Sequence, residues 1–535
     1  MRKQSFLQGA AILVVAGLAS RLLGAILRIL LPRLLGAEAI GVLEMATPVY
    51  TLFTVIAIAG LPVTVSKLVA EQAALRSSEG VFRVFHVATA FFILVGITFS
   101  FLLIISARSL ASRVLGDFGA FYSIVVFAPA IVFLSVAAAL RGFFQGLQDM
   151  VPSAISQIAE QVVRVPSILF FAVTLLPYGV EYGAAGAALG GAVGAGAGAA
   201  ILVVAYLRSR KKLRKEIGPA RPLTGTSTIR ILHQVLYLAV PIVIGALIAP
   251  VMSLLDAVIV PRQLQKLGIT MEVVRRLFGE LNGMAMVLAI FPSLLTQSLA
   301  ISLVPAVAGA MALKDHKLLN ERVEDAIRLS IMFGLPAATG LLILAEPICS
   351  LLYNDPAAAI PLVYLAPGIP FLCLQDTTVG IQQGMGRVRE PVWYLFYGAV
   401  VKGVLTYVLT GIPSLGVRGA ALATVIGFAV TAVLNLRAVY RQTGIRFNLW
   451  NLVAKPAFNL LLMVIVVNSV YSFLGAVSIL YNSRVNNAVS TLGAVMAGAV
   501  VYLLGMAISG GLQERDLQVF GRVGNRLALL WKGKE

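Results

Sequence analysis

The feature that most constrains this chain is a succession of apolar runs, each long enough to cross a lipid bilayer. Of its 535 residues, 59% are hydrophobic and only 12% are charged, a composition that is not found in soluble domains. Because hydrocarbon offers the backbone no hydrogen-bond partners, apolar runs of about 20 residues or more cross it as helices. The sequence therefore predicts an all-α polytopic membrane protein with about fourteen transmembrane helices. The predicted spans are 5–35, 44–70, 82–107, 119–145, 152–177, 183–207, 231–258, 282–312, 327–352, 360–385, 391–411, 416–437, 454–475 and 486–509.

The distribution of positive charge predicts the orientation of these spans. The formal net charge is +19, which by itself would suggest a nucleic-acid partner. The lysines and arginines lie mainly in short loops, however, and alternate loops carry roughly three times as many as the others. With a cytoplasmic N-terminus, the loops that carry more lysines and arginines fall inside, and Arg141 is counted among their residues. The sequence thus predicts two cytoplasmic termini, contact with anionic lipids and no nucleic-acid partner.

Short motifs recur in the two halves of the chain, in the same order, which predicts an internal repeat. An even number of spans separates equivalent motifs, so the two halves point the same way through the membrane. In such a parallel repeat, a substrate site is expected between the halves near mid-membrane. The paired motifs are Leu61-Pro62 with Val304-Pro305, Gln145-Gly146 and Pro152 with Gln383-Gly384 and Pro391, and Gly186-Ala-Ala-Leu189 and Gly194 with Gly419-Ala-Ala-Leu422 and Gly427.

This repeat suggests the domain organisation. The basic run 208–215 between the halves anchors on anionic headgroups or, alternatively, docks a partner. An outside loop contains 271–278, for which we predict a short interfacial helix. The predicted parts are a first six-helix lobe at 1–207, a basic cytoplasmic linker at 208–230, a second six-helix lobe at 231–441, two extra helices at 442–510 and a basic cytoplasmic tail at 511–535.

The first span carries two arginines on one face. Arg21 and Arg28 lie seven residues apart and therefore share a helical stripe. Gly17 and Gly24 fall on the same stripe and leave space beside it. A guanidinium in hydrocarbon costs several kcal/mol, so this face must look onto protein or water. We predict a transport cavity for an anionic cargo; the alternative is that Arg28 reaches the far interface and a buried partner neutralises Arg21.

Two further cations occupy equivalent places of the repeat. Arg164 follows Pro152 by twelve residues, and Lys402 follows Pro391 by eleven. Polar residues accompany Arg164 along one face of its helix, which must line an aqueous space or another helix. We predict that Arg21, Arg28, Arg164 and Lys402 bind substrate together with Gln157 and Gln161. The polar face consists of Ser153, Ser156, Gln157, Glu160, Gln161, Arg164 and Ser167.

Three acidic residues inside predicted spans are candidates for coupling transport to Na⁺, H⁺ or the membrane potential: Glu160, Asp256 and Asp376. Glu160 and Arg164 are four residues apart on a helix, so we expect them to pair. A further hypothesis pairs Asp256 with Arg28. The alternative is that these charges only lock helices together.

Several motifs resemble those of a known transporter family. They are Ser20-Arg-Leu-Leu-Gly24, Gly60-Leu-Pro-Val63 with Ser66-Lys67, Arg141-Gly-Phe-Phe-Gln-Gly-Leu-Gln148, and Gln383-Gly-Met-Gly-Arg387. Over nearly its whole length, the chain resembles the polysaccharide-biosynthesis and stage V sporulation protein B branch of the multidrug/oligosaccharidyl-lipid/polysaccharide (MOP) exporter superfamily. This branch includes the MurJ-type lipid II flippases.

The resemblance implies two lobes in a V shape around a cationic cavity, in a bacterial plasma membrane, with two extra helices that form a groove for a lipid tail. The implied cargo is an undecaprenyl-diphosphate-linked cell-wall precursor, moved from the inner to the outer leaflet by alternating access. Arg21 matches a functionally important arginine of MurJ-like proteins. The stretch 286–290 lacks an arginine expected in that family, so undecaprenyl-linked glycans other than lipid II stay open.

Three other functions fit the sequence less well. A cation-coupled multidrug exporter of the same superfamily would have twelve spans and a pocket dominated by carboxylates. An enzyme acting on polyprenyl substrates would need grouped acids or histidines with a metal, but the two cysteines are isolated and the three histidines have no ligand spacing. A scaffold for cell-wall assembly would have no use for buried cations. We therefore predict a monomeric transporter without metal or cofactor, for which cell-wall synthesis proteins are candidate partners.

Overall fold

The computed structural model describes residues 6–217, 227–445, 454–476 and 483–511, and these residues form helices and turns without a strand. Thirteen helices in this part of the chain are long and apolar enough to cross a membrane. The first, Ala19–Ala74, has 56 residues and includes most of the first predicted span and all of the second. At about 1.5 Å per residue it is far longer than one crossing needs. The predicted all-α polytopic membrane fold is confirmed.

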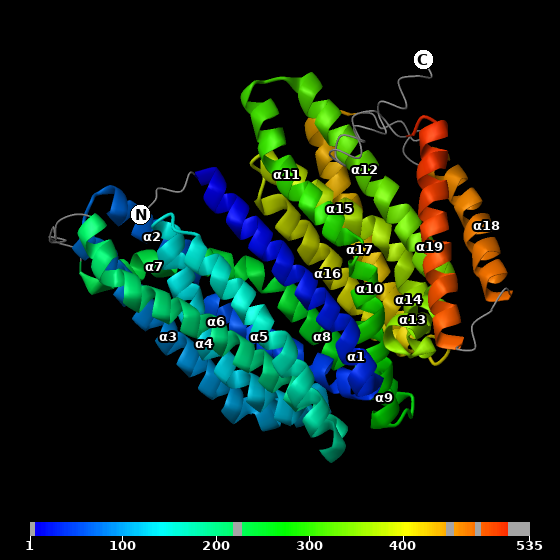
Figure 1. Cartoon of the computed structure of the whole chain (residues 1–535), viewed down its shortest axis with the longest axis horizontal. Helices are drawn as coiled ribbons and strands as arrows, with labels where there is room; N and C mark the ends of the chain where they lie inside the picture. The colour runs from blue at the N-terminus through cyan, green and yellow to red at the C-terminus, as the bar shows by residue number, and fades with distance from the viewer. Residues whose placement is uncertain (1–5, 218–226, 446–453, 477–482, 512–535) are drawn as a thin grey trace. The chain divides into compact units, whose positions relative to one another are not determined.

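The chain divides into two compact units, Met1–Gly279 and Glu280–Glu535. Unit 1 contains α1 (Phe6–Ile58), α2 (Leu61–Ala74), α3 (Ser78–Ser109), the π-helix η1 (Leu110–Leu115), α4 (Ala120–Gly146), α5 (Val151–Leu175), the 3₁₀ turn η2 (Leu176–Tyr178), α6 (Val180–Ile217), α7 (Thr228–Ala246), α8 (Ile248–Lys266) and α9 (Met271–Phe278) (Figure 1). The π-helix η3 (Gly279–Ala285) follows at the boundary.

Unit 2 contains α10 (Met286–Ile290), α11 (Ser293–Ala312), α12 (His316–Ile343), α13 (Ala345–Tyr353), η4 (Pro356–Ala358), α14 (Ala359–Leu365), η5 (Ala366–Gly368), α15 (Ile369–Gly384), α16 (Arg389–Thr410), α17 (Val417–Thr443), α18 (Lys455–Ala476) and α19 (Ser483–Ile508). Parts of the predicted linker (218–226) and tail (512–535) lie outside the described residues.

The boundary between the units differs from the predicted lobes, because the helices at 228–266 pack with unit 1. We expected 231–258 to open the second lobe, but α7 lies against α2 and α3, and α8 lies against α1. The reason is hydrophobic burial: Ile231, Val235 and Ala239 of α7 join a buried apolar cluster of unit 1. Unit 1 is therefore larger than a six-helix lobe.

A backbone break divides α1 into two helical segments. Gly36 has φ 78° and ψ 167°, a conformation that side chains disfavour, so glycine is required there. Directly after the break, α9 presses on α1 so closely that a Cβ at Gly41 would collide with the carbonyl oxygen of Arg275. Helix α9 was expected as a short interfacial helix, and its helical structure at Met271–Phe278 is confirmed.

An ion-pair cluster holds α9 on unit 1. Arg275 donates two hydrogen bonds to Asp117, from Nε to Oδ2 at 2.7 Å and from Nη2 to Oδ1 at 2.6 Å. A third contact joins its Nη1 to Glu38 Oε1 of α1 at 3.4 Å. The hydrogen bonds to Asp117 raise the pKa of the Arg275 guanidinium above its ordinary value. The Arg275 guanidinium therefore joins α9 to α1 and to the loop before α4 that carries Asp117.

The predicted repeat reappears in how helices pack inside each unit. In unit 1, Gly146 of α4 packs against α2, where an added Cβ would lie 2.6 Å from the carbonyl oxygen of Ser66. In unit 2, Gly384 of α15 packs against α11, where the corresponding distance to the carbonyl oxygen of Val304 is 2.8 Å. The same offset along the chain separates both pairs, so α2 and α4 correspond to α11 and α15.

The packing corrects one of the paired motifs. Gly142 of α4 lies against Pro62, and Gly380 of α15 lies against Ala300. The structural counterpart of Pro62 is therefore Ala300, although the dipeptide pattern had matched Pro62 with Pro305. The match between Leu61-Pro62 and Val304-Pro305 arose by chance, because both dipeptides occur in apolar helices of similar composition.

Replacing Gly384 by valine should destabilise unit 2. The new Cβ would lie 2.7 Å from Val307 Cβ and 2.8 Å from a backbone carbonyl, so helices α11 and α15 would have to separate. Overpacking of this kind costs about 1–3 kcal/mol. The midpoint of thermal unfolding in detergent should fall. Gly309→Val is the matched control on α11, because nothing lies within 4 Å of a Cβ there.

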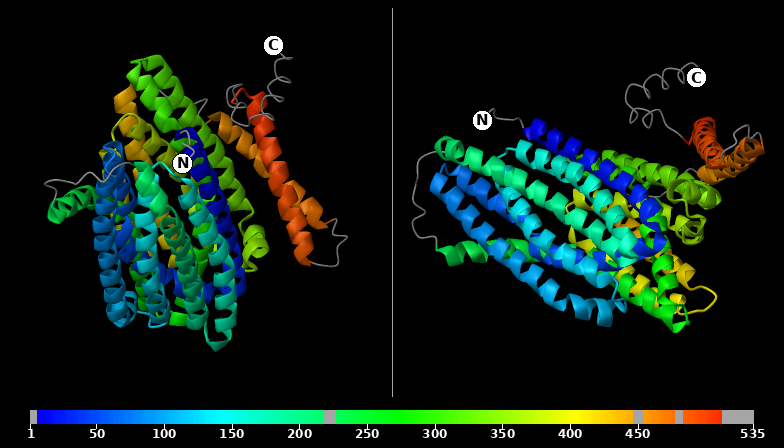
Figure 2. Two further views of the ribbon diagram at one scale, coloured as in Figure 1. Left: turned by 60° about the vertical axis from the view of Figure 1, so that its left-hand side comes forward. Right: turned by 60° about the horizontal axis from the view of Figure 1, so that its bottom comes forward.

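The two extra helices form a hairpin, with α18 and α19 side by side in every view (Figures 1 and 2). Met463 and Val467 of α18 and Tyr502 and Met506 of α19 share a buried cluster with Met332 of α12. At the end of α19, Arg328 of α12 donates a hydrogen bond from Nη1 to the carbonyl oxygen of Gly511 at 3.0 Å. The hairpin is thus an integral part of unit 2.

Candidate functional site

The arginine face of the first span is open. Arg21 and Arg28 are both exposed in the structure. A Cβ added to Gly17 or Gly24, on the same stripe, would meet nothing within 4 Å, so no helix among the described residues packs against these two positions of α1. The positive charge of Arg28 interacts electrostatically with the carboxyl group of Glu44, which lies beyond the break in α1. This stripe therefore has the space and the charge to receive an anion.

The neighbouring helix α5 carries the polar face predicted from the sequence. Helix α1 lies along α5, and the Ser20 hydroxyl is 3.5 Å from the carbonyl oxygen of Gln157. Ser153, Ser156 and Glu160 are buried against other helices, whereas Gln157, Gln161, Arg164 and Ser167 are half-buried. We expected this face to line either an aqueous space or another helix. Its buried residues pack against other helices.

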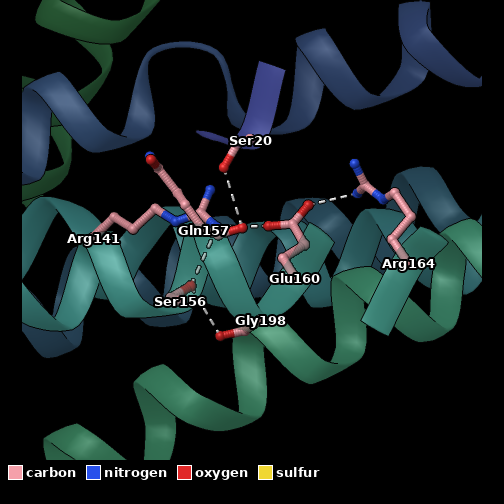
Figure 3. A network of polar contacts seen from close by, with 7 residues as sticks. All are labelled: Ser20, Arg141, Ser156, Gln157, Glu160, Arg164 and Gly198. Atoms are coloured by element: carbon pink, nitrogen blue, oxygen red, sulfur yellow. Dashed lines mark hydrogen bonds and ion pairs between the residues drawn. The ribbon is translucent and has the colours of Figure 1, made fainter. Parts of the chain in front are cut away.

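An ion-pair network occupies the middle of this face (Figure 3). Arg164 Nη2 donates to Glu160 Oε1 at 2.5 Å, which confirms the predicted pair. The second oxygen of the carboxylate, Oε2, accepts from Arg141 Nη2 of α4 at 2.7 Å. Figure 3 shows Glu160 between the two guanidinium groups. Arg141 was counted among the cytoplasmic loop residues, but it lies within α4 and its side chain reaches α5; this placement was wrong.

Helix α6 lies so close to the network because it presents glycines to α5. A Cβ at Gly194 would lie 2.5 Å from Arg164 Cβ, and one at Gly198 would lie 3.0 Å from Glu160 Cβ. Small residues at four-residue spacing let membrane helices approach at their backbones. The carbonyl oxygen of Gly198 also accepts a hydrogen bond from Ser156 Oγ at 3.1 Å. The backbone of α6 therefore fixes one wall of the network.

The equivalent position of unit 2 is built alike but carries a different charge. Lys402 of α16 packs on Gly427 of α17, where an added Cβ would lie 2.8 Å from Lys402 Cβ. Arg164 and Gly194 have the same relation in unit 1. Four residues before Lys402 stands Gly398, at the place of Glu160. Unit 2 therefore has the cation but no carboxylate at the equivalent of Glu160.

The remaining acidic candidates lie on other helices. Asp376 of α15 faces the polar side chains of Ser293, Thr296 and Gln297 of α11 in unit 2. Asp256 is half-buried on α8, which packs against α1. The charge found to act with Arg28 belongs to Glu44, so the pairing of Arg28 with Asp256 stays a hypothesis.

Sequence reasoning missed two charged residues near the candidate site, Arg141 and Glu44. Arg141 stands in the motif that begins Arg141-Gly-Phe, and its distance of nineteen residues from Glu160 has no helical periodicity. Glu44 is the first residue of the second predicted span, and an acidic residue at the end of a span is readily assigned to the adjoining loop. A search for charges within five residues of the span ends would have found both.

Comparison with known proteins identifies the family. Residues 6–311 match the family described as polysaccharide biosynthesis protein. The chain belongs to this family. Residues 280–408 also match the MatE family. Thirteen helices of membrane-spanning length in its described part make this member of the family a multi-pass membrane protein.

Relatives of this family member match almost all of its length. Stage V sporulation protein B of Bacillus subtilis is 29% identical over 98% of this chain and 99% of its own. Lipid II flippase MurJ of Bacillus subtilis is 24% identical over 93% of this chain and 94% of its own. The solved structure of lipid II flippase MurJ in an inward closed conformation has a TM-score of 0.66 at 17% identity and covers 93% of this chain and 98% of its own. The likeness therefore includes the two extra helices.

Proposed function

We propose that this protein is a flippase for an undecaprenyl-diphosphate-linked cell-wall precursor, lipid II or a related lipid-linked glycan. It moves this cargo from the inner to the outer leaflet of the bacterial plasma membrane by alternating access. In this proposal both termini are cytoplasmic and the functional form is a monomer.

The observation that carries this proposal is the open arginine stripe of α1. Arg21 and Arg28 are exposed on a helix long and apolar enough to cross the membrane, beside two glycines against which no described residue packs. A diphosphate that crosses hydrocarbon unpaired would cost tens of kcal/mol. Guanidinium groups lower that cost because they donate two parallel hydrogen bonds to phosphate oxygens. The proposed role of the stripe is to hold the diphosphate during the crossing.

The second part of the proposed site is the polar face of α5. Gln157, Gln161 and Arg164 are half-buried on a helix that lies along α1. Amide side chains suit the hydroxyl and amide groups of sugars and peptides, and Arg164 adds a cation. Lys402 of unit 2 is likewise proposed to bind substrate.

The proposed coupling residue is an acid of unit 2. Asp376 has a carboxyl oxygen, Oδ2, that is buried without a hydrogen-bond partner in the described part of the chain. Such an atom needs a proton or a cation in a membrane span. We therefore propose Asp376, ahead of Asp256, as the site where Na⁺ or H⁺ is coupled to transport; the membrane potential is the alternative energy source.

Cation-coupled drug export is the second candidate function, because residues 280–408 match the MatE family. A pocket for organic cations is dominated by carboxylates. The exposed charges of the α1 stripe are guanidinium groups, which repel such substrates.

One reconstitution experiment separates the two functions. Full-length protein in liposomes should move a fluorescent undecaprenyl-diphosphate sugar from the inner to the outer leaflet, where an external quencher or reductant detects it. The same vesicles should not extrude ethidium against an imposed Na⁺ or H⁺ gradient. Ethidium transport without movement of the labelled lipid would overturn the proposal.

A further inference from the structure

The motif that begins Arg141-Gly-Phe has no role in the function proposed so far. Its arginine lies near the end of α4 and reaches across to α5. There, Arg141 Nη2 contacts Glu160 Oε2 at 2.7 Å and Ser156 Oγ at 3.3 Å. Ser156 is fixed in turn, because its hydroxyl donates to the carbonyl oxygen of Gly198. The position of Arg141 is thus defined by two other helices, α5 and α6.

The network has an unequal number of charges. Two guanidinium groups, those of Arg141 and Arg164, share the single carboxylate of Glu160, so the three side chains together carry one positive charge. The side chains of Arg164, Arg141 and Glu160 are 25%, 19% and 9% exposed, respectively. The cation that is most open to a ligand is therefore Arg164, and the carboxylate is the most enclosed member.

We propose that Arg141 is a positioning residue, which keeps Glu160 neutralised so that Arg164 can leave the carboxylate and bind an anionic ligand with the chemistry of a diphosphate. This inference rests on the proposed function and assigns a division of labour within the same site. Glu160 acts in it as a fixed counter-ion and not as the coupling residue.

The energetic reason is the cost of an unpaired buried carboxylate. If Glu160 had Arg164 as its only partner, the pair would be neutral, and a ligand that drew Arg164 away would leave a buried charge behind. Removing one member of a buried ion pair is strongly unfavourable, because the other charge is left buried without a partner. With Arg141 in place, the carboxylate keeps a hydrogen-bonded cation when Arg164 turns to the ligand. The exchange then replaces one charge-assisted hydrogen bond by another.

The packing allows Arg164 to move but not Glu160. A Cβ at Gly198 would lie 3.1 Å from Glu160 Oε2, so the backbone of α6 closes that side of the carboxylate. Arg164 has the longer side chain and the larger exposed fraction. Figure 3 shows its guanidinium at the end of the network, with Arg141 on the opposite side of Glu160.

A charge series tests this inference through binding alone. The probe is inorganic pyrophosphate, titrated into the purified full-length protein in detergent at fixed ionic strength. Arg141→Gln makes the network neutral and should raise the Kd by about tenfold or more, because Arg164 then stays bound to Glu160 and the ligand loses a charge-assisted hydrogen bond. Glu160→Gln raises the network charge and should lower the Kd. The double variant Arg141→Gln with Glu160→Gln carries one positive charge again and should bind more tightly than Arg141→Gln.

The double variant distinguishes this role from a structural one. If Arg141 and Glu160 only locked helices together, removing both would weaken binding at least as much as removing Arg141. That result, or a Kd of Arg141→Gln equal to that of the wild type, would overturn the inference. Arg108→Gln is the matched control, because Arg108 is exposed at the end of α3 and lies outside the network. If Arg141→Gln does not fold, the Kd values of Arg141→Lys and Glu160→Gln for pyrophosphate are compared in its place. Glu160→Gln is expected to bind more tightly than Arg141→Lys.

The assay separates this inference from the proposed function. Pyrophosphate has no lipid tail, and its binding needs no translocation. If the Kd follows the network charge while vesicles move no labelled lipid, the inference stands and the flippase proposal fails. If vesicles move the lipid while the Kd ignores the network charge, the proposal stands and the role of Arg141 fails.

Discussion

Replacing Arg21 by alanine should reduce translocation of a lipid-linked diphosphate by at least about a hundredfold, because the first span would lose a bidentate phosphate ligand. The side chain is exposed, so its removal should change the free energy of unfolding by only about 0.5 kcal/mol or less. The initial rate in liposomes with a fluorescent undecaprenyl-diphosphate sugar measures the first effect, and thermal unfolding in detergent measures the second.

Arg108→Ala provides the control for this experiment. It removes an exposed guanidinium from the last turn of α3, on a helix that also crosses the membrane. The translocation rate of this variant should stay close to that of the wild type. Equal rates for Arg21→Ala and the wild type would remove the basis for an anion-binding stripe on α1.

Replacing Arg275 by alanine should have the largest effect on stability among the substitutions considered. The side chain of Asp117 is only 2% exposed and accepts two hydrogen bonds from Arg275. Without the guanidinium, the carboxylate would keep the amide of Gly119 at 2.8 Å but would have lost the cation that pairs with it. A buried ion pair that loses one partner costs about 3–5 kcal/mol. We expect the midpoint of thermal unfolding in detergent to fall by several degrees.

The pH dependence of this effect follows from the raised pKa of Arg275. Its pKa is raised in the folded protein by the hydrogen bonds to Asp117, so its contribution is complete below the pKa of the unfolded chain and is lost only above it. The pKa of an arginine in the unfolded chain lies well above this range, so the destabilisation should be the same from roughly pH 7 to pH 10. Glu272→Gln, an exposed neighbour on α9, should have little effect. A similar loss in both variants would indicate that α9 itself is fragile and that Arg275 has no special role.

The sequence predicted the helices well because membrane helices are recognised by length and apolarity, which are local properties. The spans, the short helix α9 and the equivalence of Arg164 with Lys402 all follow from such local patterns. The assignment of α7 to unit 1 does not follow from a local pattern. It depends on which helices Ile231 and Val235 meet, and an apolar helix has no sequence signal that selects among apolar neighbours.

The candidate site was predictable in part, for the same reason. The pair of Glu160 with Arg164 follows from helical spacing, whereas the contact of Arg141 with Glu160 joins two helices and has no spacing rule. The cluster of Arg275, Asp117 and Glu38 joins residues up to 237 positions apart. Whether Arg21, Arg28, Lys402 and the glutamines bind the cargo stays a prediction, as does the coupling role of Asp376.

The hydrogen bond from Arg328 to the carbonyl oxygen of Gly511 sets a practical limit on shortening this protein from its C-terminal side. The Arg328 side chain is only 8% exposed, so it relies on acceptors supplied by the protein. A truncation that removes Gly511 would delete one of these acceptors and with it a hydrogen bond between α12 and the end of the hairpin. A stop codon or affinity tag should therefore be introduced after this glycine, so that the acceptor is retained.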